Sequence, residues 1–137
     1  MKKLLFATDG SDSSTKAAAM AEELLSLWTA AELTVLYVSP RIDPRFEMTW
    51  MVEEEYEYAE RLREQVNEQF KNWGGRVEYK NVVGPPVTSI CQTAEDEGAE
   101  MIIIGSHGRG AIDRMVLGSV SHGVLYRSRM PVLVVKG

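Results

Sequence analysis

Short apolar runs alternate along the chain with longer segments in which apolar residues recur every three or four positions. Five runs have the length of a strand, and continuous apolar runs of this kind are typical of strands buried in a parallel sheet. The third run is more polar and alternating, so we predict that it lies at a sheet edge. The predicted strands are Lys3–Thr8, Glu32–Ser39, Arg76–Val83, Met101–Gly105 and Pro131–Val135.

Four amphipathic segments between these runs predict helices. We expect Asp12 or Ser13 to cap the first helix, and Gly74-Gly75 to end the second, which runs from about Met51 to Trp73. The remaining two helices are predicted over Val87–Glu97 and Val120–Ser128. The apolar stripe of the second helix comprises Val52, Tyr56, Ala59, Leu62, Val66, Phe70 and Trp73.

An acidic cluster falls in the first turns of this second helix. Carboxylates near a helix N-terminus favour the helix dipole, so we interpret the cluster as a solvated helix start rather than a metal site. The segment before it, Pro40–Trp50, contains two prolines and mixed charges and is predicted to be a surface loop beside the functional site. The cluster consists of Glu53, Glu54, Glu55 and Glu57.

The order of elements predicts one α/β domain over residues 1–137, a doubly wound, five-stranded parallel sheet with helices on both faces. Ligands of such sheets bind at the carboxyl ends of the strands. Thr8-Asp9, Val38-Ser39 and Gly105-Ser106 follow the first, second and fourth strands. If the first and fourth strands are neighbours, Asp9 flanks one crevice with the glycine stretch that follows the fourth strand. With phosphate bound by that stretch, we expect Asp9 to bond a ribose or adenine edge, and the backbone of Val38 to bond a base.

The stretch Gly105–Ser121 is the strongest candidate for chemistry. Glycines let the backbone approach an anion closely, and Gly118-Ser119 opens a helix whose N-terminal amides favour phosphate. Neither common phosphate motif fits, because no Gly-x-x-x-x-Gly-Lys-Ser/Thr occurs and Asp113 stands where a dinucleotide fingerprint needs glycine. The stretch is predicted to be a phosphate cradle of a different kind.

Charge and composition narrow the classes of function. The net charge of −5 makes broad electrostatic capture of DNA or RNA unfavourable. The single cysteine, Cys91, excludes an internal disulfide and fits a cytoplasmic location. No apolar run has the length of a membrane helix or signal peptide. An apolar last strand at a sheet edge needs a cover, so we expect a homodimer through Pro131–Val135.

These motifs resemble those of the universal stress protein family, over the whole chain. The resemblance rests on the opening Leu4–Ser11, on Gly84-x-Pro86-x-x-x-Ile90, and on the ending Pro131–Val135. Gly105-x-x-Gly108-x9-Gly118-Ser119 is similar to the family's ATP-binding motif, which implies the ATP-binding kind. The family's fold is Rossmann-like, of the adenine nucleotide alpha hydrolase type, and its members dimerise through the last strand.

The resemblance implies a set of nucleotide contacts. Adenine and ribose contacts fall on Ala7, Thr8, Asp9 and Val38. Phosphate contacts fall in the glycine stretch, with Mg²⁺ or Mn²⁺ expected to bridge the phosphates. The predicted phosphate-side residues are Gly105, Ser106, Gly108, Arg109, Gly118, Ser119, Val120 and Ser121.

Three functions remain in competition. The first is a nucleotide-dependent regulatory or stress-response protein with at most slow ATP hydrolysis, in which His107 orients a water or simply bonds the loop backbone. The second is an enzyme of the related ATP-pyrophosphatase type, which Asp9 disfavours because a carboxylate replaces glycine in the loop after the first strand. The third, serine hydrolysis, is disfavoured because the chain lacks a Gly-x-Ser-x-Gly elbow.

Overall fold

The computed structural model describes residues 1–43, 45–107 and 117–137. Within them, five strands alternate with four α-helices, as the hydrophobic pattern predicts, and a short 3-10 helix, η1, follows the second α-helix. The elements are β1 (Lys3–Ala7), α1 (Asp12–Leu27), β2 (Glu32–Ser39), α2 (Thr49–Gln69), η1 (Lys71–Arg76), β3 (Val77–Val83), α3 (Pro86–Asp96), β4 (Met101–Gly105), α4 (Ser119–Arg127) and β5 (Val132–Val135).

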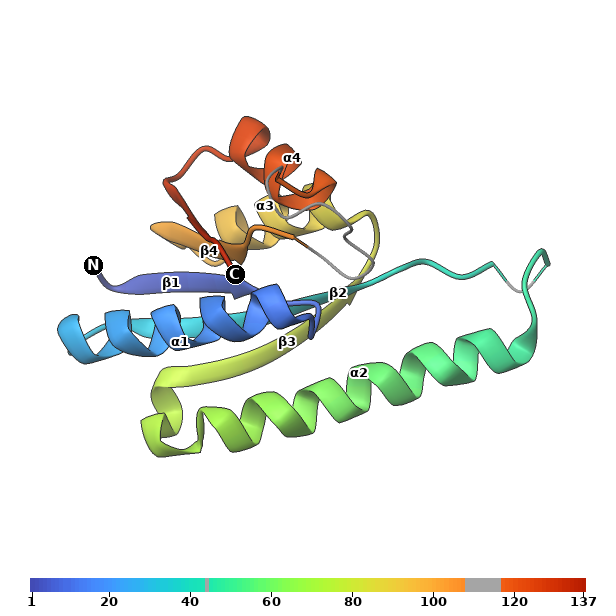
Figure 1. Cartoon of the computed structure of the whole chain (residues 1–137), viewed down its shortest axis with the longest axis horizontal. Helices are drawn as coiled ribbons and strands as arrows, with labels where there is room; N and C mark the ends of the chain where they lie inside the picture. Colours follow the sequence, from blue (N-terminus) through green and yellow to red (C-terminus); the bar gives the residue numbers. More distant parts are fainter. Residues whose placement is uncertain (44, 108–116) are drawn as a thin grey trace.

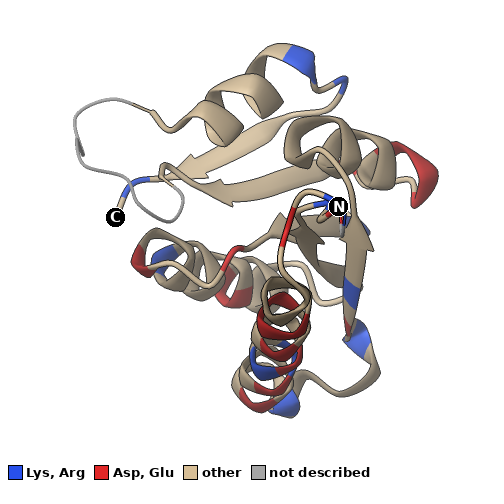
Figure 2. Ribbon diagram, turned by 90° about the vertical axis from the view of Figure 1, so that its right-hand side faces the viewer, with Lys and Arg blue, Asp and Glu red and all other residues tan. Residues whose placement is uncertain are grey.

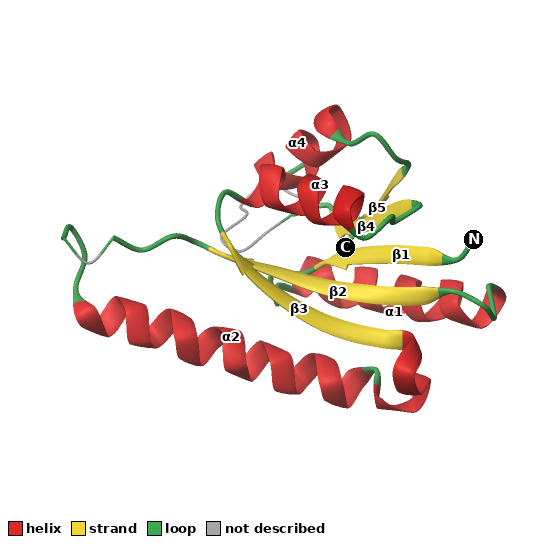
Figure 3. Cartoon of the chain, turned by 180° about the vertical axis from the view of Figure 1, so that it is seen from behind, coloured by secondary structure: helices red, strands yellow, loops and turns green. Residues whose placement is uncertain are grey.

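The strands form one parallel sheet in the order β3-β2-β1-β4-β5 (Figure 3). The predicted doubly wound α/β fold is confirmed, and β3 lies at an edge as its polar pattern indicates. Connections run outward from β1 in both directions, so the order reverses between β1 and β4. Ala7 pairs with Leu36 on one side and with Ile104 on the other. The carboxyl ends of these three strands therefore meet at the switch point, where ligands of such sheets bind.

Alternate side chains of each strand pack into two separate cores, one on each face of the sheet. In β1, Leu4 and Phe6 pack on the face covered by α1 and α2, whereas Leu5 and Ala7 pack on the face covered by α3 and α4. Because successive side chains of a strand point to opposite faces, nearly continuous apolar strands are needed when helices cover both. Figure 1 shows this arrangement, with α1 and α2 on one side of the sheet and α3 and α4 on the other.

The cap of α1 differs from the prediction. Ser11, rather than Asp12 or Ser13, is the N-cap, and its hydroxyl accepts a hydrogen bond from the Ser14 amide. Asp12 is the first residue of the helix, where its charge favours the helix dipole. The cap lies one residue earlier because Gly10, with φ of +79°, turns the chain away from β1 immediately before Ser11.

The bounds of α2 also differ from the prediction. The helix begins at Thr49 and ends at Gln69, so Gly74-Gly75 do not end it, and the acidic cluster starts beyond the first turn. Val52 and Tyr56 of the predicted stripe are 41% and 68% exposed. The reason is tertiary, because the N-terminal half of α2 extends past the carboxyl edge of the sheet (Figures 1 and 3). An amphipathic pattern marks a face but not the length of sheet available to cover it.

Acidic residues recur along α2 and outnumber its basic residues (Figure 2). Glu53, Glu54 and Glu57 are exposed, as a solvated acidic segment requires. Glu55 instead faces inward and accepts a hydrogen bond from the Tyr37 hydroxyl of β2.

In the part of the chain that the structure describes, no helix combines the length and hydrophobicity needed to cross a bilayer.

Candidate functional site

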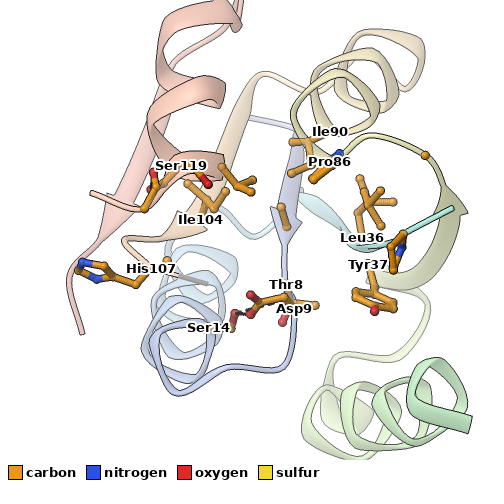
Figure 4. Close-up of a pocket in the computed structure, with 18 residues that line it drawn as sticks. Thr8, Asp9, Ser14, Leu36, Tyr37, Pro86, Ile90, Ile104, His107 and Ser119 are labelled. Atoms are coloured by element: carbon orange, nitrogen blue, oxygen red, sulfur yellow. Dashed lines mark hydrogen bonds between the residues drawn. The ribbon is translucent and has the colours of Figure 1, made fainter. Parts of the chain in front are cut away.

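A cavity of about 810 Å³ opens at the carboxyl ends of β1, β2 and β4 (Figure 4). It combines the ends of these three strands, the turn into α3 and the N-terminus of α4. Its volume is in the range of cavities that hold a drug-sized ligand. The described residues that line it are Ala7, Thr8, Asp9, Ser14, Leu36, Tyr37, Val38, Pro40, Gly84, Pro86, Ile90, Ile104, Gly105, His107, Gly118, Ser119, Val120 and Ser121.

Residues predicted from distant parts of the sequence come together in this cavity. Ser106 is the exception, because it is 2% exposed and does not line the cavity. Gly108 and Arg109 lie outside the described residues. The predicted residues that line the cavity are Ala7, Thr8, Asp9, Val38, Gly105, Gly118, Ser119, Val120 and Ser121.

Asp9 is held in a compact turn at the end of β1. Its Oδ1 accepts hydrogen bonds from the Ser11 amide and the Ser14 hydroxyl, each at 2.9 Å. The Thr8 hydroxyl accepts from the Gly10 amide at 3.2 Å, which closes the turn. The sequence suggested only a loop carboxylate here. The structure shows a carboxylate oriented by its own loop and by the first turn of α1.

The N-terminus of α4 forms the opposite wall. Gly118 is the N-cap and has no side chain to bond the first turn of the helix. The amides of Ser119, Val120 and Ser121 are the first three of the helix, and amides at these positions have no intrahelical acceptor. They stand at the positive end of the helix dipole, in a wall of the cavity. This arrangement suits an anionic group.

The hydroxyls of this segment do not all face the cavity. Ser121 is buried, and its hydroxyl lies 2.8 Å from the Ser106 carbonyl and 3.0 Å from the Gly118 carbonyl. A hydroxyl has one proton to donate, so the Ser121 side chain is engaged inside the protein. The Gly118 amide also donates to the Ser106 carbonyl, at 2.7 Å. Ser106 and Ser121 therefore fasten α4 to β4, while Ser119 is exposed.

An apolar wall completes the cavity on the side of α3. Leu36, Ile90 and Ile104 belong to the core between the sheet and helices α3 and α4, and Pro86 begins α3. Sequence reasoning missed this wall, because apolar residues in strands and helices look the same whether they face a core or a cavity. Only the strand order, which sets β2 and β4 on either side of β1, brings them to one surface.

His107 lines the cavity on the side of α4 (Figure 4). Its Nδ1 is 2.9 Å from the Ser106 hydroxyl, and its amide donates to the Ser13 hydroxyl at 3.2 Å. Its Nε2 is buried and has no hydrogen-bond partner among the residues the structure describes.

Cys91 lies apart from the cavity. It packs against the core between the sheet and helices α3 and α4 and does not line the cavity. Burial raises the pKa of the Cys91 thiol, which disfavours the nucleophilic thiolate.

Comparison with known proteins supports the sequence resemblance. Residues 1–136 match the Universal stress protein family. Universal stress protein MJ0531 of Methanocaldococcus jannaschii is 32% identical over 98% of this chain and 82% of its own length. The solved structure of MJ0577, from the same organism, is 34% identical, with a TM-score of 0.76 over 99% of this chain and 96% of that one.

A further similar structure was solved as a complex. It is a universal stress protein in complex with cAMP, 26% identical to this chain, with a TM-score of 0.76 over 98% of this chain and 96% of that one. The family match spans nearly all of the chain, and both solved structures share its parallel α/β fold. The chain therefore belongs to the universal stress protein family.

Proposed function

We propose that the cavity binds an adenine nucleotide, ATP foremost, and that the protein acts as a nucleotide-dependent regulatory or stress-response protein. One observation carries this proposal. A single cavity joins an apolar wall at Leu36, Ile90 and Ile104 to the uncapped N-terminus of α4. The flat, apolar adenine base suits the apolar wall, and the chain of phosphates suits the N-terminus of α4.

The turn at Asp9 suits the ribose. Asp9 lines the same cavity as the apolar wall and the N-terminus of α4, and a carboxylate accepts hydrogen bonds from ribose hydroxyls or an adenine amino group. At the end of β1, the Thr8 amide donates the last hydrogen bond from this strand to β2, and the Leu36 carbonyl accepts it. Val38 lies two residues further along β2, past the end of β1, so its peptide group is available to a base.

The relative that is complexed with cAMP supports an adenine nucleotide as the ligand class. The choice of ATP rests on the glycine stretch, in which Gly108 and Arg109 complete the phosphate motif in sequence. A divalent ion fits as an accompanying group. Mg²⁺ is commonly held by one or two carboxylates together with substrate phosphates, and Asp9 is the one acidic residue among the described residues of the cavity wall.

The arrangement favours regulation over adenylating chemistry. An enzyme of the ATP-pyrophosphatase type needs an open loop after the first strand to cradle pyrophosphate. Here the Asp9 carboxylate fills that turn through its hydrogen bonds to Ser11 and Ser14. A negative charge fixed at this position repels a pyrophosphate. We therefore propose at most slow hydrolysis, with His107 the candidate to orient a water.

Calorimetric titration with ATP and Mg²⁺ tests the proposal, preceded by mass spectrometry of any small molecule released on denaturation. Gly118→Val places a side chain at the α4 N-terminus and is expected to abolish binding. Gly75→Val is the matched control, because Gly75 is exposed and a β-carbon there meets nothing within 4 Å. Equal affinity in the wild type and Gly118→Val would remove α4 from the site.

We also propose a homodimer through the free edge of β5. The Pro131 and Val135 carbonyls accept hydrogen bonds from Ile102 of β4 and from Ser106 just after it, so the alternate residues Val132 and Val134 direct their peptide groups to the outer edge of β5. Val134→Pro removes one outward donor without breaking the bond to β4 and should yield a monomer in sedimentation. Val134→Ala, which keeps the donor, should stay dimeric. A monomeric wild type would exclude this interface.

A further inference from the structure

One hydrogen bond links α2 to the loop that carries Asp9. The Tyr58 hydroxyl, in the middle of α2, donates to the backbone carbonyl of Asp9, 49 positions away in the sequence. Asp9 lines the nucleotide cavity, whereas Tyr58 lines a second, smaller cavity of about 390 Å³ beside α2. Tyr58 therefore contacts the Asp9 loop on the side of the second cavity and does not line the nucleotide cavity itself.

Gly10 makes this contact close. Its φ of +79° lies in the left-handed region, and a β-carbon there would stand 2.5 Å from the Tyr58 hydroxyl oxygen. The tyrosine hydroxyl thus occupies the space that a side chain at position 10 would take. The loop backbone rests directly on Tyr58, so the tyrosine limits how far the loop can move toward α2.

The other side of the loop is held by α1. The Ser11 amide and the Ser14 hydroxyl bond Asp9 Oδ1, while Tyr58 bonds the Asp9 carbonyl. A residue fixed at its carbonyl and its carboxylate has little freedom to rotate. The direction of the Asp9 side chain into the cavity therefore depends on α2 as well as on α1.

Tyr58 is itself fixed by packing. Its ring centroid lies 5.6 Å from that of Tyr37, with the planes tilted by 59°. Tyr37 is 1% exposed, lines the nucleotide cavity and donates its hydroxyl hydrogen bond to Glu55, one turn before Tyr58 on α2. Tilted aromatic pairs at this separation are favourable and define a ring orientation.

We propose that Tyr58 is a positioning residue for nucleotide binding, which acts through Asp9 by holding the loop between α1 and α2. The inference rests on the function proposed above and adds a residue that makes no ligand contact. It assigns α2 a direct part in the affinity of the site. A shift of the middle of α2 then alters nucleotide affinity through one hydrogen bond.

The test compares two tyrosine hydroxyls by calorimetric titration with ATP and Mg²⁺. Tyr58→Phe removes the hydroxyl that bonds the Asp9 carbonyl and should weaken ATP binding about three- to tenfold, the loss expected for one hydrogen bond. Tyr79→Phe is the matched control, because the Tyr79 hydroxyl also donates to a backbone carbonyl, that of Ala59 on α2, but does not line the cavity. Its ATP affinity should equal that of the wild type.

A double-mutant cycle separates positioning from general destabilisation. In an Asp9→Ala background, Tyr58→Phe should have no further effect on ATP affinity, because the group it positions is gone. Fully additive losses would overturn the inference. Equal affinity of Tyr58→Phe and a wild type that binds ATP would overturn it while leaving the proposed function standing. A wild type that binds no adenylate would overturn both.

Hydrogen exchange supplies a readout that needs no ligand. The Ser11 amide is bonded to Asp9 Oδ1, so loosening the loop exposes it. Tyr58→Phe should accelerate exchange at Ser11 by several-fold, with exchange in the strand core of β1 unchanged. Unchanged exchange at Ser11 would show that the loop does not depend on Tyr58.

Discussion

Gly105, the last residue of β4, lies directly against Ser13 in the first turn of α1. A β-carbon on Gly105 would stand 2.6 Å from the Ser13 hydroxyl oxygen and 2.9 Å from both its carbonyl carbon and its carbonyl oxygen. The amide of His107, two residues on, donates to the same hydroxyl. Gly105, the first glycine of the predicted motif, thus serves the packing of α1 on the sheet as well as the shape of the cavity.

We predict that Gly105→Ala lowers the free energy of unfolding by about 1–3 kcal/mol, because the contact is with backbone atoms that cannot rotate away. Urea denaturation measures the change. Gly75→Ala is the control, since a β-carbon at Gly75 meets open space and should leave stability nearly unchanged. A loss in ATP affinity with wild-type stability would instead assign Gly105 to ligand contact alone.

Arg76 closes the C-terminal end of α1. Its guanidinium donates three hydrogen bonds of 2.9 Å, to the carbonyls of Leu25, Trp28 and Ala31. Arg76→Met keeps the aliphatic stem but removes the guanidinium donor from all three carbonyls, of which that of Trp28 still accepts from the Ala31 amide. We expect a loss of about 2–3 kcal/mol in the free energy of unfolding, measured by thermal or urea denaturation.

Lys71→Met is the matched control for Arg76→Met. Lys71 pairs with Glu68 at the exposed end of α2, and a surface pair of this kind contributes little. Its removal should change stability by less than about 0.5 kcal/mol. Equal losses in the two variants would show that Arg76 does not cap α1.

Glu97 is expected to make the free energy of unfolding fall as the pH becomes acidic. Burial by itself raises its pKa, but hydrogen bonds from Thr34 and Lys80, together with the charge of Lys3, outweigh burial and hold the pKa below its ordinary value. A carboxylate whose pKa is lower in the folded protein stabilises the fold above its unfolded pKa. This contribution is lost as pH falls through the folded value.

Glu97→Gln should therefore be less stable than the wild type at pH 7, and the difference should shrink as pH falls below about 4. Chemical denaturation of both proteins at pH 7 and pH 3 measures it. A constant difference across this range would show that Glu97 contributes through shape rather than charge.

Asp9→Ala should weaken ATP binding by about 1–3 kcal/mol if the carboxylate bonds the ribose or base. It also removes the acceptor for Ser11 and Ser14, so a modest loss of stability should accompany it. Asp9→Asn keeps an acceptor oxygen but not the charge. Calorimetry on the two variants separates the hydrogen bond from the charge, and unchanged affinity in both would make Asp9 a turn residue only.

Sequence and structure agree most closely where local pattern decides the outcome. The five apolar runs, their order with the helices and the polar edge strand follow from the spacing of side chains alone. Element ends agree less well, because Ser11 caps α1 and Phe70 follows the last residue of α2. Those ends depend on one turn residue and on the length of sheet available for packing, neither of which periodicity records.

The candidate site divides in the same way. Glycine and serine spacing predicted Gly118 and Ser119 as site residues, and the order of strands and helices predicted the loop at Asp9. All three residues line the cavity, because glycines mark where backbone amides are accessible and the strand order brings the two loops together. The apolar wall at Ile90 and Ile104 and the support of Asp9 by Tyr58 were decided by tertiary structure. Such contacts join residues dozens of positions apart, and only the strand order and the placement of α2 determine which of them meet.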